Sequence, residues 1–361
     1  MREPAPATAR RLSDRLDQGE RELVQSLAQL AGGSGATSHP HHSATRQAAT
    51  RQAAARQAAT RLAASLARRP PGTPGLDPLV WLVYYRLGQA LLAQDASPLP
   101  WTQFPERLDQ LGGRSLPPGQ VIAWGDSTVY SPAEWQAILA LLQEGGDFIS
   151  DLAPPAAATQ AALQEATATV LALVRGLPTG LGPSLDRLLP LTILALPGPR
   201  AQAAGEGFGG ATAFFLRGAS VIHASPGLTL PGLLERLVHE AAHAELFVLA
   251  QDGPLCHNPD DERHPVRIRP DPRPMNGILH SLHVTGRVCE TLDALLADGL
   301  PWQPQRAALL EDLRRLREQQ ADLGRSSLAA VRRHGRLTAL GASVCDAAVR
   351  RLAGEPPGAT P

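Results

Sequence analysis

The sequence predicts a mainly α-helical protein that carries one small β-sheet. Apolar residues recur at helical spacing through most of the chain. Short apolar or β-branched runs bounded by Gly and Pro occur in one zone only, and this zone lies directly before a long helix expected at 231–251. The strands are expected at 191–198, 212–217 and 219–225. Further helices with buried faces are expected at 76–94, 132–144, 156–175, 303–323 and 326–352.

Composition and charge exclude several classes of protein. The 361 residues hold 34 basic and 34 acidic side chains, so the formal net charge is zero and the chain is no polycation for nucleic acid. Three cysteines without a CxxC pair exclude a disulfide framework and favour a reducing compartment. No apolar stretch is long enough to span a membrane, and no secretory signal is evident. We therefore expect a cytoplasmic protein without nucleic-acid or membrane partners.

The first part of the chain differs in composition from the rest. Residues 8–31 have the spacing of an amphipathic helix, and residues 45–64 repeat the pattern TRQAA. A five-residue repeat advances about 500° on a helix, so its arginines turn around the axis and no apolar face is expected. We expect a solvated helix or, alternatively, a basic arm for an acidic peptide or nucleic acid. The chain is thus expected to divide into an N-terminal segment, 1–70, and a catalytic domain, 71–355.

One motif carries chemistry. The helix expected at 231–251 contains His239, Glu240 and His243 in the pattern HExxH. Because positions i and i+4 lie one turn apart on one face of a helix, both imidazoles can reach a single metal ion. Glu240 projects beside them, toward a metal-bound water or a ligand. A surface helix with two unrelated histidines is the alternative.

A third metal ligand is expected on a second helix, which opens at Gly277. His280 of this helix can complete a three-histidine site, and His283 is the reserve ligand. Two further histidines, His257 and His264, lie in the Pro-rich loop between the helices and are expected to be solvated.

Arg287 follows His280 by two helical turns on the same face. An arginine placed there can pair with a carboxylate that is bound next to the metal. This arrangement indicates a co-substrate or substrate with a carboxylate group.

The segments HEAAHAELFVL and RPDPRPMNGILHSLHVTGRV resemble the HExxH-motif family of peptide-modification proteins that are encoded beside ribosomally made peptide natural products. The resemblance covers about residues 185–300. It implies a non-haem Fe(II), 2-oxoglutarate-dependent oxygenase that β-hydroxylates side chains of a precursor peptide, on a fold unlike the cupin barrel. By the same resemblance, iron would be held by three side chains: His239, His243 and His280.

The residues alone do not choose between iron and zinc, because imidazole suits both metals. The HExxH pattern by itself favours a zinc metallopeptidase, in which Glu240 activates zinc-bound water as the general base. An oxygenase also needs a cation for the far carboxylate of 2-oxoglutarate, and the resemblance gives that role to Arg273 or Arg287. The oxygenase is our leading interpretation, the peptidase is the alternative, and a non-catalytic module that binds a metal or a peptide is the third.

Overall fold

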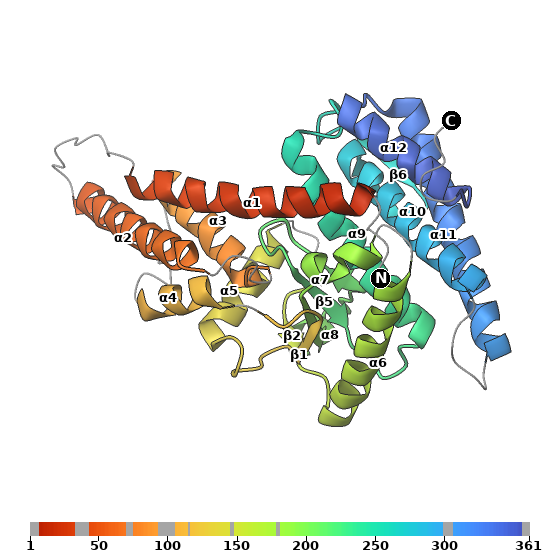
Figure 1. Ribbon diagram of the computed structural model, residues 1–361, viewed down its shortest axis with the longest axis horizontal. Helices are drawn as coiled ribbons and strands as arrows, with labels where there is room; N and C mark the ends of the chain where they lie inside the picture. Colours follow the sequence, from red (N-terminus) through yellow and green to blue (C-terminus); the bar gives the residue numbers. More distant parts are fainter. Residues whose placement is uncertain are drawn as a thin grey trace. The chain divides into compact units, whose positions relative to one another are not determined.

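The computed structural model describes residues 7–32, 43–69, 75–92, 105–114, 116–144, 148–177, 181–298 and 306–355. These residues are mainly helical, with small sheets and no closed barrel among them, so the predicted fold class is confirmed (Figure 1). The chain forms two compact units. We call them the sheet unit, 14–155 and 189–223, and the helical unit, 1–13, 156–188 and 224–361.

The sheet unit is built on three parallel strands. The central strand β3 (Leu191–Pro197) lies between β1 (Gln120–Ala123) and β5 (Ala219–His223). Two short strands pair antiparallel with them, β2 (Leu152–Ala153) with the end of β3 and β4 (Gly210–Ala211) with β5. The first five residues of β3 are apolar or Thr and are all buried, which is typical of a central parallel strand.

One expected strand is not formed. Residues 212–217, which read TAFFLR, make turns between β4 and β5. Their aromatic side chains pack against the unit without pairing: the rings of Phe215 and Tyr85 stack at 4.0 Å, and Arg217 lies 4.4 Å from the ring of Trp81. Aromatic and β-branched composition reports a half-buried position more reliably than it reports strand pairing.

Helices cover the strands of the sheet unit. Residues 14–32 of α1 belong to it, although this helix begins in the helical unit. The helices are α1 (Ala7–Gly32), α2 (Ser43–Ala67), α3 (Pro78–Leu92), α4 (Pro105–Gly113), α5 (Pro132–Gln143) and α8 (Pro199–Ala203).

Helix α2 contradicts the expectation of a solvated repeat. Ala55, Ala59, Leu62 and Leu66 are buried, and together they join the hydrophobic core of the sheet unit. Their spacings of four, three and four place them on one face, which packs against α3 and α4. The repeat contains an apolar stripe because its alanines are small enough to be buried in a close helix contact. None of the four boundaries between the compact units lies near residue 70.

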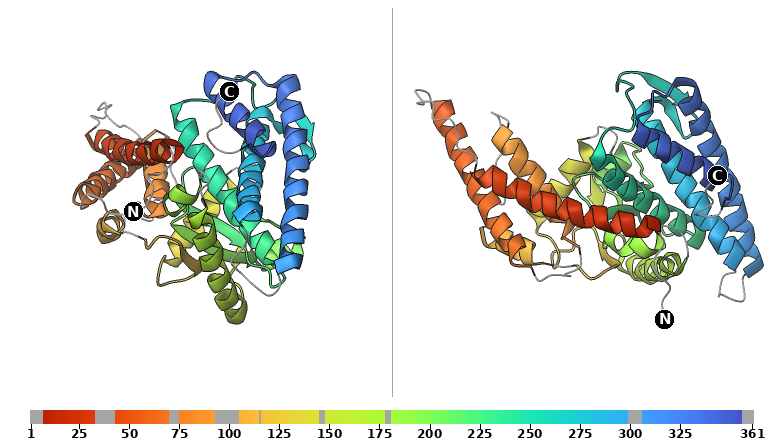
Figure 2. Two further views of the ribbon diagram at one scale, coloured as in Figure 1. Left: turned by 45° about the vertical axis from the view of Figure 1, so that its right-hand side comes forward. Right: turned by 45° about the horizontal axis from the view of Figure 1, so that its top comes forward.

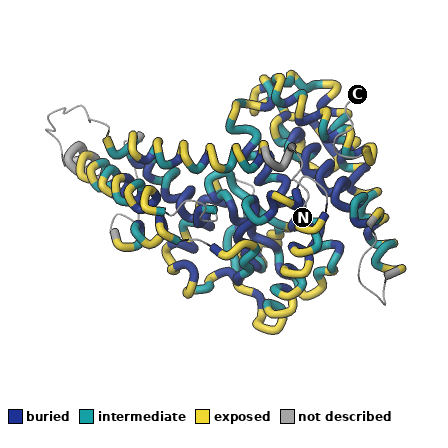
Figure 3. The backbone as a smooth tube through the Cα atoms, in the orientation of Figure 1, coloured by how far each residue is buried: buried dark blue, intermediate teal, exposed yellow. Residues whose placement is uncertain are grey.

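The helical unit is arranged around a single long helix, α10 (Met275–Asp298). Residues 282–292 of α10 are all buried (Figure 3). Helix α10 packs against α9, α11 and α12, and the last three helices of the chain lie side by side (Figure 2). The other elements are α6 (Ala157–Gly176), α7 (Leu185–Leu188), α9 (Leu230–Leu249), β6 (Arg263–Val266), β7 (Arg269–Pro274), α11 (Arg306–His334) and α12 (Ala339–Leu352), with short 3₁₀ turns at Gly182–Ser184 and Ala250–Asp252.

The break between the last two helices lies later than expected. Gly324 does not end a helix, because α11 runs through it to His334. A Cβ atom on Gly324 would lie 2.6 Å from Leu352 and 2.8 Å from Thr285, so this glycine permits close contact with α10 and α12. The helix ends just before Gly335, and Thr338 caps the next one by accepting a hydrogen bond from Gly341 N.

No helix among the described residues is long and apolar enough to cross a membrane.

Candidate metal centre

Helix α9 presents the HExxH motif. Thr229 caps its first turn by accepting a hydrogen bond from the backbone N–H of Gly232, and Pro231 suits this turn because it has no N–H to satisfy. Leu233, Leu237 and their apolar neighbours bury the opposite side of the helix. The motif therefore sits on a capped helix whose opposite side is buried.

Three imidazoles gather where α9 packs against α10. The ring centroids of His239 and His243 are 4.9 Å apart, and those of His243 and His280 are 5.7 Å apart. Phe247, one turn beyond the motif, closes one side of the cluster, with its ring 5.6 Å from that of His280. The structure thus brings together all three residues that the sequence predicts as ligands.

One of the two ring spacings fits a pair of metal ligands, but the three side chains do not converge on a common point as placed. A metal–nitrogen bond of about 2.0–2.1 Å places the centroids of two imidazole ligands about 4.6–5.3 Å apart at bond angles between square and tetrahedral. The first spacing falls in this range and the second is slightly longer. Among the described residues, no group of three or more His, Cys, Asp or Glu side chains is placed so that it could hold a metal ion.

The environment keeps two of these imidazoles neutral. Burial lowers the pKa of His243 well below its ordinary value, and the neighbouring imidazoles of His239, His280 and His283 lower it further. Burial and the His283 imidazole lower the pKa of His280 to about 4. Neutral imidazole is the form that binds a metal, so both rings are ready to bind at neutral pH.

Glu240 is 3% exposed, on the same helix as the two motif histidines. Its predicted contact with a metal-bound water or a ligand stays a prediction, because the structure carries neither.

Arg287 takes a different position from the one expected. It is 2% exposed, and its Nε donates to Glu245 Oε2 at 2.6 Å while a terminal nitrogen bonds the other oxygen of the same carboxylate. The remaining terminal nitrogen donates to Glu290 Oε2 at 2.6 Å, and Arg351 Nε lies 3.3 Å from that same oxygen. Since all three nitrogens of Arg287 are committed to buried carboxylates, this side chain does not offer a cation to a co-substrate.

Burial and neighbouring charges shift the pKa of Glu245 in opposite directions. Burial alone would raise its pKa, but the Arg287 guanidinium and a hydrogen bond from His283 outweigh it and hold the pKa far below its ordinary value. Glu245 is therefore an ionised carboxylate, which only accepts hydrogen bonds. The sequence analysis did not single out this residue. The sequence does offer one sign of it, since Glu245 is an acidic residue directly before the apolar run LFVL.

His283, the expected reserve ligand, is 1% exposed and belongs to the same network. Its Nε2 lies 3.0 Å from Glu245 Oε2, so Nε2 carries the proton that is donated. Its buried Nδ1 has no hydrogen-bond partner among the described residues. His283 is thus held in place by the carboxylate of Glu245.

Arg273 lies on β7, two residues before α10 begins, and is partly buried. In the ladder with β6 it pairs with His264. It is the remaining candidate for the carboxylate of a co-substrate.

Two further histidines, His257 and His264, lie on the segment between α9 and α10. His257 is exposed, as expected. His264 is buried and corrects that expectation, because its ring stacks on that of His334 at 4.2 Å with 15° between the planes. Parallel stacked rings direct their nitrogen lone pairs side by side, so they cannot share a metal ion.

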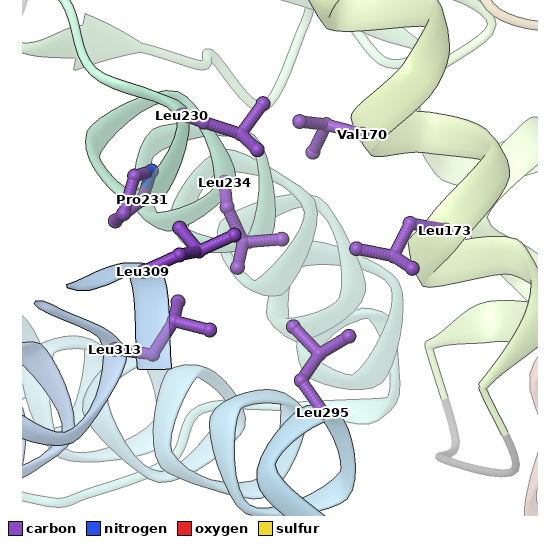
Figure 4. Close-up of a pocket in the computed structure, with 8 residues that line it drawn as sticks. All are labelled: Val170, Leu173, Leu230, Pro231, Leu234, Leu295, Leu309 and Leu313. Carbon is purple, nitrogen blue, oxygen red and sulfur yellow. The ribbon is translucent and has the colours of Figure 1, made fainter. Parts of the chain in front are cut away.

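An apolar pocket lies elsewhere in the helical unit. It is small, with a cavity volume of about 10 Å³, and is partly open to solvent; Figure 4 shows the side chains that line it. Eight apolar side chains from α6, α9, α10 and α11 line it: Val170, Leu173, Leu230, Pro231, Leu234, Leu295, Leu309 and Leu313. With no polar group in its lining, it provides no chemistry of its own.

The chain matches no family model and no curated protein.

Proposed function

We propose that the chain is a metal-dependent enzyme whose metal ion is held by His239, His243 and His280. The gathering of these three rings from two helices is the observation that carries the proposal. Two histidines at helical spacing arise by chance more readily than a third ring delivered from another helix to the same place. The lowered pKa values of His243 and His280 support the same assignment.

We further propose that the reaction is the Fe(II)- and 2-oxoglutarate-dependent β-hydroxylation of side chains in a ribosomally synthesised precursor peptide, in the cytoplasm. This part rests on the resemblance of the two helical segments to the HExxH-motif peptide-modification family. Bound Fe(II) would supply the activation of O₂ coupled to the oxidation of 2-oxoglutarate. The protein's own part is to hold the metal with neutral imidazoles and to bind the far carboxylate through Arg273.

A zinc metallopeptidase remains the second candidate. One observation favours it: burial of Arg287 in ion pairs removes one of the two cations that separated an oxygenase from a hydrolase. In that enzyme Glu240 would take a proton from water that attacks a peptide carbonyl.

Binding of 2-oxoglutarate tests the choice between the two enzymes. Anaerobic protein loaded with Fe(II) should give a new visible absorption band when 2-oxoglutarate is titrated in. Arg273→Gln should weaken this binding by about 2–4 kcal/mol, because a bidentate charge-assisted pair is lost. Arg267→Gln, an exposed arginine in the turn of the same hairpin, is the matched control and should bind normally. No band with the wild type, together with zinc in the purified protein, would favour the peptidase.

Product analysis separates the candidates at Glu240. With peptide, Fe(II), 2-oxoglutarate and O₂, the wild type should add one oxygen atom, and His280→Ala should abolish the product together with metal binding. If the protein is an oxygenase, Glu240→Gln should lower its activity only in part. Peptide-bond cleavage that requires Glu240 and ignores 2-oxoglutarate would overturn the oxygenase assignment.

A further inference from the structure

A carboxylate stands directly behind one of the three imidazoles. Glu235 precedes His239 by four residues, so the two side chains lie one turn apart on the same face of α9. Its Oε1 lies 3.3 Å from Nδ1 of His239. The Glu235 side chain is 20% exposed and that of His239 is 31% exposed, so both are partly buried.

A second helix holds this carboxylate in place. Gln320 of α11 donates from Nε2 to the same Oε1 atom of Glu235 at 3.1 Å. Gln320 is 6% exposed, and a buried amide has few alternative partners. The chain of contacts therefore runs from α11 through Gln320 and Glu235 to the motif histidine, and it restricts the rotamer of Glu235.

This contact selects one tautomer of His239. A carboxylate accepts hydrogen bonds and cannot donate them, so the nitrogen that faces it must carry the proton. With Nδ1 protonated in the neutral ring, the lone pair is on Nε2. Metal-binding histidines commonly donate their other nitrogen to a carboxylate, which fixes ring orientation and makes the ligand more basic.

We propose that Glu235 is the positioning residue for His239, that Gln320 holds Glu235 in this role, and that Nε2 of His239 is thereby presented to the metal. The inference deepens the proposed three-histidine site and rests on it. Neither residue touches the metal, so their effect is on affinity and on the tautomer of His239.

Metal titration of the full-length protein provides the first test. We would titrate metal-free protein with Co(II) alone and measure the dissociation constant from the visible bands of the bound ion. Glu235→Gln keeps the size of the side chain but replaces one acceptor oxygen by a donor, and it should weaken Co(II) binding about 10–100-fold. Gln320→Met should weaken it less. Glu318→Gln, an exposed glutamate on α11, is the matched control and should bind as the wild type does.

The outcomes separate this inference from the metal site itself. A wild type that binds no Co(II), or a His239→Gln variant that binds as tightly as the wild type, would contradict the three-histidine site. A wild type that binds while Glu235→Gln and Gln320→Met bind within twofold of it would overturn the positioning role alone. Thermal unfolding of each metal-free variant checks that it is folded. If Glu235→Gln does not fold, the Co(II) affinity of Gln320→Met tests the positioning role in its place.

The tautomer gives a readout that a merely structural glutamate would not change. In metal-free protein labelled with ¹⁵N-histidine at pH 8, Nδ1 of His239 should give the signal of a protonated ring nitrogen. In Glu235→Gln the proton should move toward Nε2, whereas Glu318→Gln should show the wild-type spectrum. An Nε2-protonated His239 in the wild type would refute the proposal.

Discussion

Glu245 places a negative charge in the interior beside the imidazole cluster, and its partners determine what that charge costs. His283 and Arg287 both donate to it, and Arg287 is in turn paired with Glu290. A buried ion pair contributes little net stability against apolar residues of the same shape, but removal of one partner leaves the other uncompensated. The network therefore joins α9 to α10 through buried charges, each of which depends on the others.

Glu245→Gln should destabilise the protein by about 3–5 kcal/mol at pH 7, because Arg287 loses its main counter-charge. The folded-state pKa of Glu245 is depressed below the ordinary value of 4.5. Its stabilising effect is therefore complete above about pH 4.5 and is lost as the pH falls below that value. Urea unfolding of both proteins between pH 3 and 8 should show a difference that narrows in acid. A difference that is absent at pH 7, or that widens in acid, would contradict this view of the network.

At the scale of elements, α2 and α12 show two ways in which small residues permit close packing. In α2 the alanines and leucines of the repeat form one buried stripe. In α12 the first turn approaches the loop after α9 so closely that a Cβ atom on Gly341 would lie 1.8 Å from the carbonyl oxygen of Leu255. That carbonyl accepts the backbone N–H of Thr338, so the contact ties the start of α12 to the loop.

Leu62→Ala in α2 should cost about 2–5 kcal/mol, because the side chain is 0% exposed within the core of the sheet unit. Gln57→Ala on the exposed face of the same helix should change stability by less than about 0.5 kcal/mol. Chemical denaturation measures both. Equal, small effects would mean that α2 is solvated after all, as the repeat pattern alone predicts.

Gly341→Ala should destabilise by about 1–3 kcal/mol, because the added methyl group has no room beside Leu255. Gly88→Ala in α3, where nothing lies within 4 Å of the added atom, should instead stabilise by about 1 kcal/mol. In thermal unfolding, Gly341→Ala should lower the melting temperature and Gly88→Ala should raise it. A neutral Gly341→Ala would show that α12 does not pack as described.

At the scale of the whole molecule, the sequence predicts the features that depend on periodicity, such as which helix face a residue occupies. It misses the features that depend on which side chain of another element lies opposite. Helical spacing was enough to place His239, His243 and His280 on two helices, and the structure gathers their rings. It also placed Arg287 on the face of His280, but spacing gives only a direction. Nothing in the local pattern showed that Glu245 lies beside Arg287 and takes up its charge.

The same limit explains the errors in the fold. The mainly helical class follows from long periodic segments, whereas the break near Gly324 was misjudged because a glycine that ends a helix and one that permits packing look alike in sequence. Glu235 carried a usable signal, since it lies four residues before His239. Gln320 carried none, because α11 is brought to α9 only by the tertiary fold.

X-ray absorption by iron in the Fe(II)-loaded protein tests the three-histidine centre most directly, because it counts imidazole ligands around the metal. The wild type should show about three, at an iron–nitrogen distance of roughly 2.0–2.2 Å. His280→Gln should show two. A wild-type spectrum with no imidazole scattering, or one that His280→Gln leaves unchanged, would contradict the assignment of this site.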